Sequence, residues 1–243
     1  MNRQAQAVIM LLFGGAILKA SIGDLYLRYV KEGLRPFLIV AALLLIAAAV
    51  MTLWYDLRSP RDTGHDHGDH DHGDHAHHEP RVGWLLVLPV LGLLLVTPPA
   101  LGSYAAGQSG TALAGVQSDS DYPALPEGDP VTVTMLDYAS RAVFDEGKSL
   151  TGRRLRVTGF VTQGPDGKPM LARMILSCCA ADGRPIKVGL SGNVPANVPS
   201  DTWIEVTGGY TAQTTKDPVN QATVPYLEVE TWTEIPAPKQ QYE

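Results

Sequence analysis

Long uncharged stretches alternate with polar ones along the first half of the chain. No charged residue occurs from Pro36 to Trp54 or from Val82 to Ser118, and a third apolar stretch runs from Ala5 to Ile22. A helix rises about 1.5 Å per residue, so roughly 20 apolar residues are needed to cross about 30 Å of hydrocarbon. The pattern predicts three transmembrane helices, with spans 1 and 2 in residues 1–58 and span 3 in residues 82–103.

The first apolar stretch has a second interpretation, a cleaved signal peptide. Its charged n-region would be Arg3 alone, and no clean small-x-small cleavage site follows it. The later spans would anchor the chain in the membrane in either case. We interpret Lys19 as a side chain that reaches the membrane interface rather than as an ion relay.

Lysine and arginine counts in the short loops predict the orientation of the spans. With the N-terminus inside, four basic residues lie inside and three outside, and after span 3 none follows until Arg141. The inside residues are Arg3, Arg58, Arg61 and Arg81. These counts predict a multi-pass cell-membrane protein with a cytoplasmic loop at residues 59–81 and an extracytoplasmic C-terminal domain.

The sequence after span 3 changes from apolar to polar. Residues Tyr104–Asp129 are rich in glycine, serine, alanine and aspartate, and we expect a flexible tether there. Residues 130–236 form the predicted soluble domain, which begins with a short strand at Val131–Val133. A helix should start near Thr134, because Thr134-x-x-Asp137 resembles a capping box and apolar residues then recur at spacings of three and four.

Five further segments of this domain alternate apolar and polar positions between turns that contain glycine or proline, as in a small barrel or sandwich. The expected strands are Arg153–Val161, Met170–Leu176, Ile186–Leu190, Thr202–Tyr210 and Tyr226–Thr233. In the first strand, Leu155 and Val157 should lie on one face and Phe160 on the other. Glycines such as Gly159 and Gly208 allow the coiling that closes a barrel. We therefore predict a membrane α-helical N-terminal region followed by a small, mainly β, OB-like barrel with one helix.

The charge of the second half of the chain limits its partners. From Tyr104 onward, 11 Lys and Arg residues face 16 Asp and Glu residues, a net charge of −5. A nucleic-acid partner requires a basic footprint, so we expect none. Aromatic residues of the barrel are accordingly interpreted as core or interface packing rather than as base-stacking platforms. These residues are Phe160, Trp203, Tyr210, Tyr226 and Trp232.

All seven histidines fall in the stretch Asp62–Glu79, together with five aspartates and no basic residue. Neutral imidazole is the commonest protein ligand for zinc and also suits copper and nickel, while carboxylates can complete the shell. The predicted metal ligands are His65, His67, His70, His72, His75, His77 and His78 with Asp66, Asp69, Asp71 and Asp74. The alternative is a solvated low-complexity linker.

The two cysteines of the chain are adjacent, in the run Arg173-Met-Ile-Leu-Ser-Cys178-Cys179-Ala-Ala-Asp182. Neighbouring side chains of a strand point to opposite faces, so both thiols can act together only in a turn. There they could form a strained vicinal disulfide or bind a soft metal ion as thiolates, with Asp182 and Arg173 as further candidates for a binding or redox site. The alternative places one cysteine in the core as a small hydrophobe.

The N-terminal spans, the tether and the C-terminal domain with this motif together resemble a bacterial permease-subunit family. The resemblance is firmest from Met135 to Glu234, through Gly152–Phe160, the Cys-Cys-Ala-Ala-Asp motif at 178–182 and Trp203–Gly208. It implies an OB-like domain and, as partner, a separate polytopic membrane permease that is sometimes associated with metal handling. The histidine-rich loop is a variable feature of such proteins, so the general family function does not rest on it.

Three hypotheses of function follow. The leading one is an accessory or binding subunit of a membrane permease, embedded in the lipid bilayer and linked to a transition metal such as zinc. The second is a membrane-anchored metal-binding or metal-sensing protein without a transport role, and the third is a thiol oxidoreductase that uses Cys178 and Cys179. The barrel contains no histidine, and the chain shows no P-loop or dinucleotide fingerprint. We therefore predict no catalytic residue and expect that the chain is not an enzyme.

Overall fold

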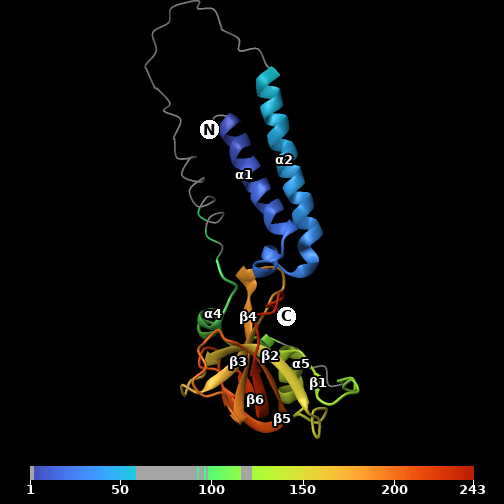
Figure 1. Ribbon diagram of the computed structural model, residues 1–243, viewed down its shortest axis with the longest axis vertical. Coiled ribbons are helices and arrows are strands. Elements are labelled where there is room, and N and C mark those ends of the chain that lie inside the picture. The colour runs from blue at the N-terminus through green and yellow to red at the C-terminus, as the bar shows by residue number, and fades with distance from the viewer. Residues whose placement is uncertain (1–2, 59–91, 93–95, 97, 116–121) are drawn as a thin grey trace, which may run out of the picture. The chain divides into compact units, whose positions relative to one another are not determined.

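The computed structural model describes residues 3–58, 92, 96, 98–115 and 122–243. The histidine-rich loop and most of predicted span 3 lie outside these residues. The described chain falls into two compact units. Helices α1 (Arg3–Ile22) and α2 (Arg35–Arg58) form the first (Figure 1), while the segment Leu27–Glu32 between them belongs with Pro99–Glu243 in the second.

Helices α1 and α2 pack against each other through small residues. A Cβ atom at Gly14 would lie only 2.8 Å from Cγ1 of Ile46, and such close backbone approach is typical of helix pairs in membranes. Three alanines of these helices are fully buried: Ala7, Ala42 and Ala49. In the described part of the chain, one helix is long and apolar enough to cross a membrane, the stretch Glu32–Arg58, whereas the apolar part of α1 is shorter, Gln6–Ile22.

The second unit contains a closed five-stranded barrel (Figure 1). Its strands are β2 (Leu155–Gln163), β3 (Pro169–Ile175), β4 (Arg184–Gly192), β5 (Trp203–Lys216) and β6 (Thr223–Glu234). The order β2-β3-β4-β6-β5 returns to β2, with β4 and β6 parallel and the other neighbours antiparallel. This topology fits the OB-like prediction. A short strand β1 (Val131–Thr132) pairs in parallel with β2 outside the ring.

Each expected strand is present, with bounds shifted by a few residues, and β5 differs most. It continues to Lys216, beyond the predicted end at Tyr210. The register between β5 and β6 shifts at Thr207/Gly208 and at Thr211/Thr214. Such irregularities let a strongly bent strand keep its pairing, and a strict two-residue period does not reveal them.

Phe160 departs from the alternation that the sequence predicts for β2. Leu155 and Val157 lie in the barrel core as expected, but Phe160, on the other face, is also buried. Its ring makes an edge contact with Trp203, with centroids 5.7 Å apart. The outer face of the barrel is covered here by a second hydrophobic cluster, which includes Ala106, Met174, Leu176 and Tyr242.

Helix α5 (Met135–Phe144) begins where the sequence predicts. The Thr134 hydroxyl accepts a hydrogen bond from the Asp137 N–H at 3.0 Å, so Thr134 is the N-cap. The buried face of the helix carries Tyr138, whose hydroxyl donates to the backbone carbonyl of Tyr226. Burial raises the pKa of Tyr138 well above its ordinary value, so this phenol remains a neutral donor.

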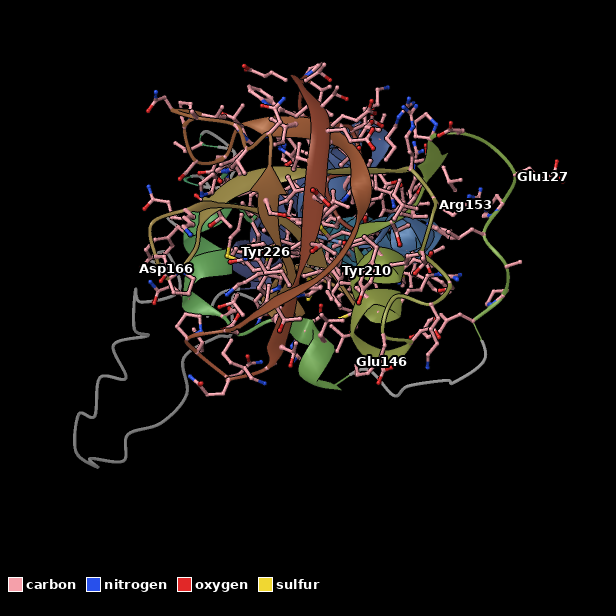
Figure 2. The ribbon with its side chains drawn as sticks, turned by 90° about the horizontal axis from the view of Figure 1, so that it is seen from below. Glu127, Glu146, Arg153, Asp166, Tyr210 and Tyr226 are labelled. Atoms are coloured by element: carbon pink, nitrogen blue, oxygen red, sulfur yellow. The ribbon has the colours of Figure 1, made fainter. Side chains whose placement is uncertain are left out.

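Two of the aromatic side chains pack over glycines. The Tyr226 ring covers Gly189, where a Cβ atom would lie 2.6 Å from the ring, and the Tyr210 ring covers Gly147. In Figure 2 both tyrosines lie nearer the centre of the view than the charged Glu127, Glu146 and Asp166 at its edge. These contacts agree with a packing role for the two tyrosines.

Residues 103–115 differ from the flexible tether that we expected. They form helix α4 (Ser103–Gln108) and a 3₁₀ turn at Ala112–Gly115, both on the barrel. The Lys187 ammonium lies 2.8 Å from Asp217 Oδ2 and donates to the Ser109 carbonyl, while the same carboxylate oxygen accepts the Thr111 N–H. Glycine and serine predicted a mobile chain, but these buried polar contacts fix it.

Candidate metal centre

The Cys-Cys motif lies in a tight turn between two barrel strands. Strand β3 ends at Ile175, a bend follows at residues 177–178, and a 3₁₀ turn (Ala180–Asp182) leads into β4. Leu176 is buried and anchors the start of the turn. At its end, a Cβ atom on Gly183 would lie 2.5 Å from Leu101 Cδ1, so the turn is packed closely on both sides. The turn that the two thiols would need in order to act together is therefore present.

The Asp182 carboxylate organises the turn. Its Oδ1 accepts the N–H of Ser177 at 3.0 Å, and its Oδ2 accepts the N–H groups of Cys178 at 2.8 Å and Cys179 at 3.5 Å. A hydrogen bond from the Cys178 thiol, together with these backbone donors, lowers the pKa of Asp182. A single side chain thus closes the loop around both cysteines and remains ionised.

The two thiols lie beside this carboxylate on the surface. Cys178 is exposed, Cys179 is partly exposed, and both are free thiols. The alternative that placed one cysteine in the core is therefore wrong, because the turn lies at the end of β3 rather than inside the barrel. The hydrogen bond to Asp182 and the neighbouring Cys179 raise the pKa of Cys178 to about 11.

These three side chains form a donor set that could hold a metal ion. The Sγ atoms of Cys178 and Cys179 and a carboxylate oxygen of Asp182 all lie within 4.8 Å of one another, the one such group in the described residues. Zinc binds thiolates at about 2.3 Å, so two thiolates on a tetrahedral ion are about 3.8 Å apart. A contraction of about 1 Å at most would bring the two sulfurs to this separation. Two sulfurs and one oxygen leave a fourth position open, and the set fits a borderline-soft divalent cation.

Arg173, the fourth candidate from the sequence, makes its contacts away from these ligands. Its guanidinium lies 3.5 Å from Glu243 Oε1, donates to the carbonyl of Gln240, and stacks 5.5 Å from the Trp203 ring. Burial lowers the pKa of Arg173, and the Glu243 charge opposes that effect. The Glu243 carboxylate also accepts the first N–H groups of helix α5, from Met135 and Leu136. Arg173 thus supports the packing of the barrel.

The segment Leu27–Glu32, which we call the connector, pairs with the turn. The Lys31 N–H donates to the Cys178 carbonyl at 3.1 Å, and the Ala180 N–H donates to the Tyr29 carbonyl at 2.7 Å. Val30 and Cys179 accordingly form an antiparallel bridge. This contact is not predictable from the sequence, because the connector carries no strand signal of its own.

Tyr242 fixes the connector from the other side. Its buried hydroxyl donates to the Arg28 carbonyl at 2.8 Å and accepts the Leu101 N–H at 2.9 Å. The Glu243 N–H donates to the Met174 carbonyl, and the Leu176 N–H donates to the Glu243 carbonyl. These bonds hold the C-terminal residues against the end of β3. The candidate turn is therefore braced by two segments distant in sequence. The predicted histidine and aspartate ligands of residues 65–78 lie outside the described residues.

The fold and the turn define a class: a chain with a helix that can cross a membrane and an OB-like barrel that presents a Cys-Cys-Asp group. Comparison with protein families agrees with this two-part organisation. Residues 5–112 match the DUF1980 N-terminal domain, and residues 127–243 match the DUF1980 C-terminal domain. The chain thus carries both domains of the DUF1980 family, whose names state no activity, substrate or partner. No curated protein and no solved structure matches the chain.

Proposed function

We propose that this chain is a membrane-anchored accessory subunit that binds a zinc-like transition metal at its Cys178–Cys179–Asp182 turn and works beside a separate polytopic permease. The observation that carries the proposal is the cluster of three ligand atoms within 4.8 Å on an exposed turn. A structural zinc site is closed by four protein ligands, whereas this one keeps a position open. An open, exposed site suits an ion that is received and passed on.

The membrane part of the proposal takes the chain as multi-pass. Helix α2 supports one span, and α1 and the uncharged stretch at residues 82–103 supply the other two. The histidine-rich loop is then cytoplasmic and the barrel extracytoplasmic, so each side of the membrane has one set of metal ligands. The three apolar stretches contain a single charged residue, Lys19. A lone charge makes a poor ion path, which is why the proposal includes a separate permease.

A metal-sensing role is the second candidate, and the connector favours it. The backbone of the turn is hydrogen-bonded to Tyr29 and Lys31, which lie between α1 and α2. A change at the cysteines is therefore in direct contact with the segment that joins the two helices. A sensor needs such a contact but needs no permease.

A thiol oxidoreductase is disfavoured by the electrostatics of the turn. A nucleophilic cysteine needs a lowered thiol pKa, which a nearby cation supplies. Here the Asp182 carboxylate raises the pKa of Cys178 to about 11. A divalent cation would reverse this balance, because it favours both thiolates and the carboxylate together.

The metal proposal is tested by titrating the full-length protein in detergent with Cd²⁺ and following the ultraviolet thiolate-to-metal charge-transfer band. Imidazole and carboxylate ligands give no such band, so the histidine-rich loop does not contribute to it. We expect one saturable site, which Cys178→Ser or Cys179→Ser abolishes and Asp182→Asn weakens. Asp166→Asn, at an exposed turn between β2 and β3, is the matched control and should change nothing. A wild-type protein without the band would refute the metal site.

The permease part needs its own experiment. Cross-linking in intact membranes followed by affinity purification should recover a polytopic protein with the wild-type chain. Recovery of no polytopic partner, with the Cd²⁺ site intact, would leave the sensor as the better candidate.

A further inference from the structure

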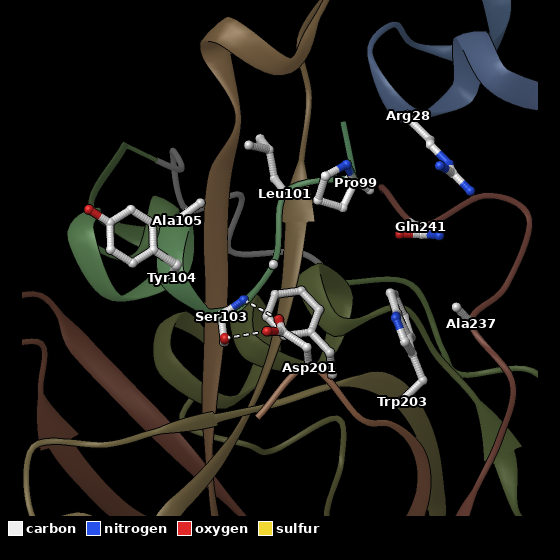
Figure 3. A pocket seen from close by; sticks show the side chains of 13 residues that line it. Arg28, Pro99, Leu101, Ser103, Tyr104, Ala105, Asp201, Trp203, Ala237 and Gln241 are labelled. Atoms are coloured by element: carbon white, nitrogen blue, oxygen red, sulfur yellow. Dashed lines mark hydrogen bonds between the residues drawn. The ribbon is translucent and has the colours of Figure 1, made fainter. Parts of the chain in front are cut away.

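A cavity lies in the barrel unit, and none of the three proposed metal ligands lines it. Its volume is about 570 Å³, within the range of about 300–1,000 Å³ that holds small ligands. Leu101, Pro99, Phe160 and Trp203 supply apolar walls, and Arg28 and Gln241 lie at its edge. Figure 3 shows Trp203, Gln241 and Arg28 along one side of this hollow, facing Pro99 and Leu101.

Three hydrogen-bond donors lie on that side of the cavity. They are the Arg28 guanidinium, the Gln241 amide and the Trp203 indole N–H. Contacts elsewhere hold the Arg28 backbone and the Trp203 ring in place. The Tyr242 hydroxyl holds the Arg28 carbonyl, and the Trp203 ring packs between the Phe160 ring and the Arg173 guanidinium.

The one carboxylate that lines the cavity is already engaged. Both oxygens of Asp201 accept hydrogen bonds from Ser103, one from its backbone N–H and the other from its hydroxyl, as the dashed lines in Figure 3 show. A cation that entered the cavity would find no free acidic ligand among the lining residues. An anion would find one full positive charge and two neutral donors.

We propose that this cavity binds an amphipathic anion, a carboxylate or phosphate group on an acyl or aryl body. The charged group is held by Arg28 with Gln241 and the indole N–H, because a guanidinium pairs with such oxyanions through paired N–H donors. The apolar body lies against Trp203, Phe160 and Leu101. The same chemistry is found in an anionic membrane lipid and in a free amphiphile. This site is independent of the metal proposal.

The test uses the full-length chain in phosphatidylcholine nanodiscs and two photoreactive probes, a diazirine fatty acid and a diazirine phosphatidylglycerol. We expect saturable cross-linking to residues 99–105 or 237–241, suppressed by unlabelled octanoate but not by its methyl ester. Arg28→Gln should reduce labelling by about tenfold, the loss expected for one charge-assisted hydrogen bond. Gln241→Ala should reduce it less.

Lys168→Gln is the charge-matched control, since Lys168 is exposed at the β2–β3 turn outside the cavity. Both variants should keep the unfolding midpoint of the wild type, which is measured alongside the labelling. Labelling by the fatty acid alone identifies a free amphiphile, and labelling by the phosphatidylglycerol probe identifies a lipid. Either result supports the site. Absence of saturable labelling, or equal labelling of Arg28→Gln and wild type, overturns it.

Discussion

Replacing Lys187 with methionine leaves a buried carboxylate without its counter-charge. The Lys187 ammonium lies 2.8 Å from Asp217 Oδ2, and the two side chains are only 8% and 0% exposed. Methionine fills a similar volume without charge. Asp217 then keeps the N–H groups of Val219 at 2.8 Å and Thr111 at 3.1 Å, and the Ser109 carbonyl loses its donor.

Removing one partner of a buried ion pair costs about 3–5 kcal/mol, because the remaining charge stays desolvated. The two surviving N–H donors place the expected loss for Lys187→Met near the lower end, at about 3 kcal/mol. Lys148→Met is the matched control. The side chains of Lys148 and Glu146 are 73% and 80% exposed, and the Lys148 Nζ atom lies 3.6 Å from Glu146 Oε2. Such a surface pair contributes about 0–1 kcal/mol.

The assay is equilibrium urea unfolding of the barrel, followed by tryptophan fluorescence. Hydrogen exchange at the Thr111 amide reports in parallel whether residues 103–115 leave the barrel. A loss for Lys187→Met of less than about 1 kcal/mol, no larger than that of the control, would refute the argument that this buried pair docks the segment.

Three further predictions concern pH, the connector and the position of the turn. Burial on its own raises the pKa of Asp217, but hydrogen bonds from Lys187 and two backbone N–H groups lower it further than burial raises it. The stability that the Asp217 carboxylate contributes should therefore be complete above about pH 4 and lost on acidification through its folded pKa. In the Asp217→Asn variant, the unfolding midpoint should depend less on pH in that range. Tyr242→Phe should cost about 1–2 kcal/mol and speed hydrogen exchange at the Leu101 amide, because the variant lacks the acceptor of that N–H; unchanged exchange would contradict the brace. In intact cells, a membrane-impermeant maleimide should label this protein at Cys178 and Cys179, the sole cysteines of the chain. Labelling of the protein that appears only after lysis would place the barrel in the cytoplasm.

Hydrophobic periodicity predicted most of the barrel. Strands with one face in the core, such as β2, show the two-residue alternation directly, and the N-cap Thr134 followed by apolar residues at helical spacing located α5. Periodicity could not reveal that a second cluster covers the outer face at Phe160. Nor could it show that Lys187 and Asp217, which are distant in sequence, hold residues 109–111 against the barrel.

The sequence indicates the candidate ligands of the site, but not the contacts that hold the turn in place. Two adjacent thiols can act together only in a turn, and the Asp182 carboxylate does close such a turn. Arg173 lies in the same motif yet pairs with Glu243, because the strand directs its side chain elsewhere. The connector contact was invisible in sequence, since backbone pairing at Tyr29 and Lys31 imposes no pattern on side chains.

The central claim is that Cys178, Cys179 and Asp182 together bind a transition metal. X-ray absorption spectroscopy at the zinc edge tests it most directly, on zinc-loaded protein from which Gly64–Glu79 has been deleted to remove the histidine ligands. The account predicts two sulfur neighbours at about 2.3 Å and oxygen neighbours at about 2.0–2.2 Å. A first shell of nitrogen and oxygen alone, unchanged in the Cys178→Ser/Cys179→Ser variant, would contradict it.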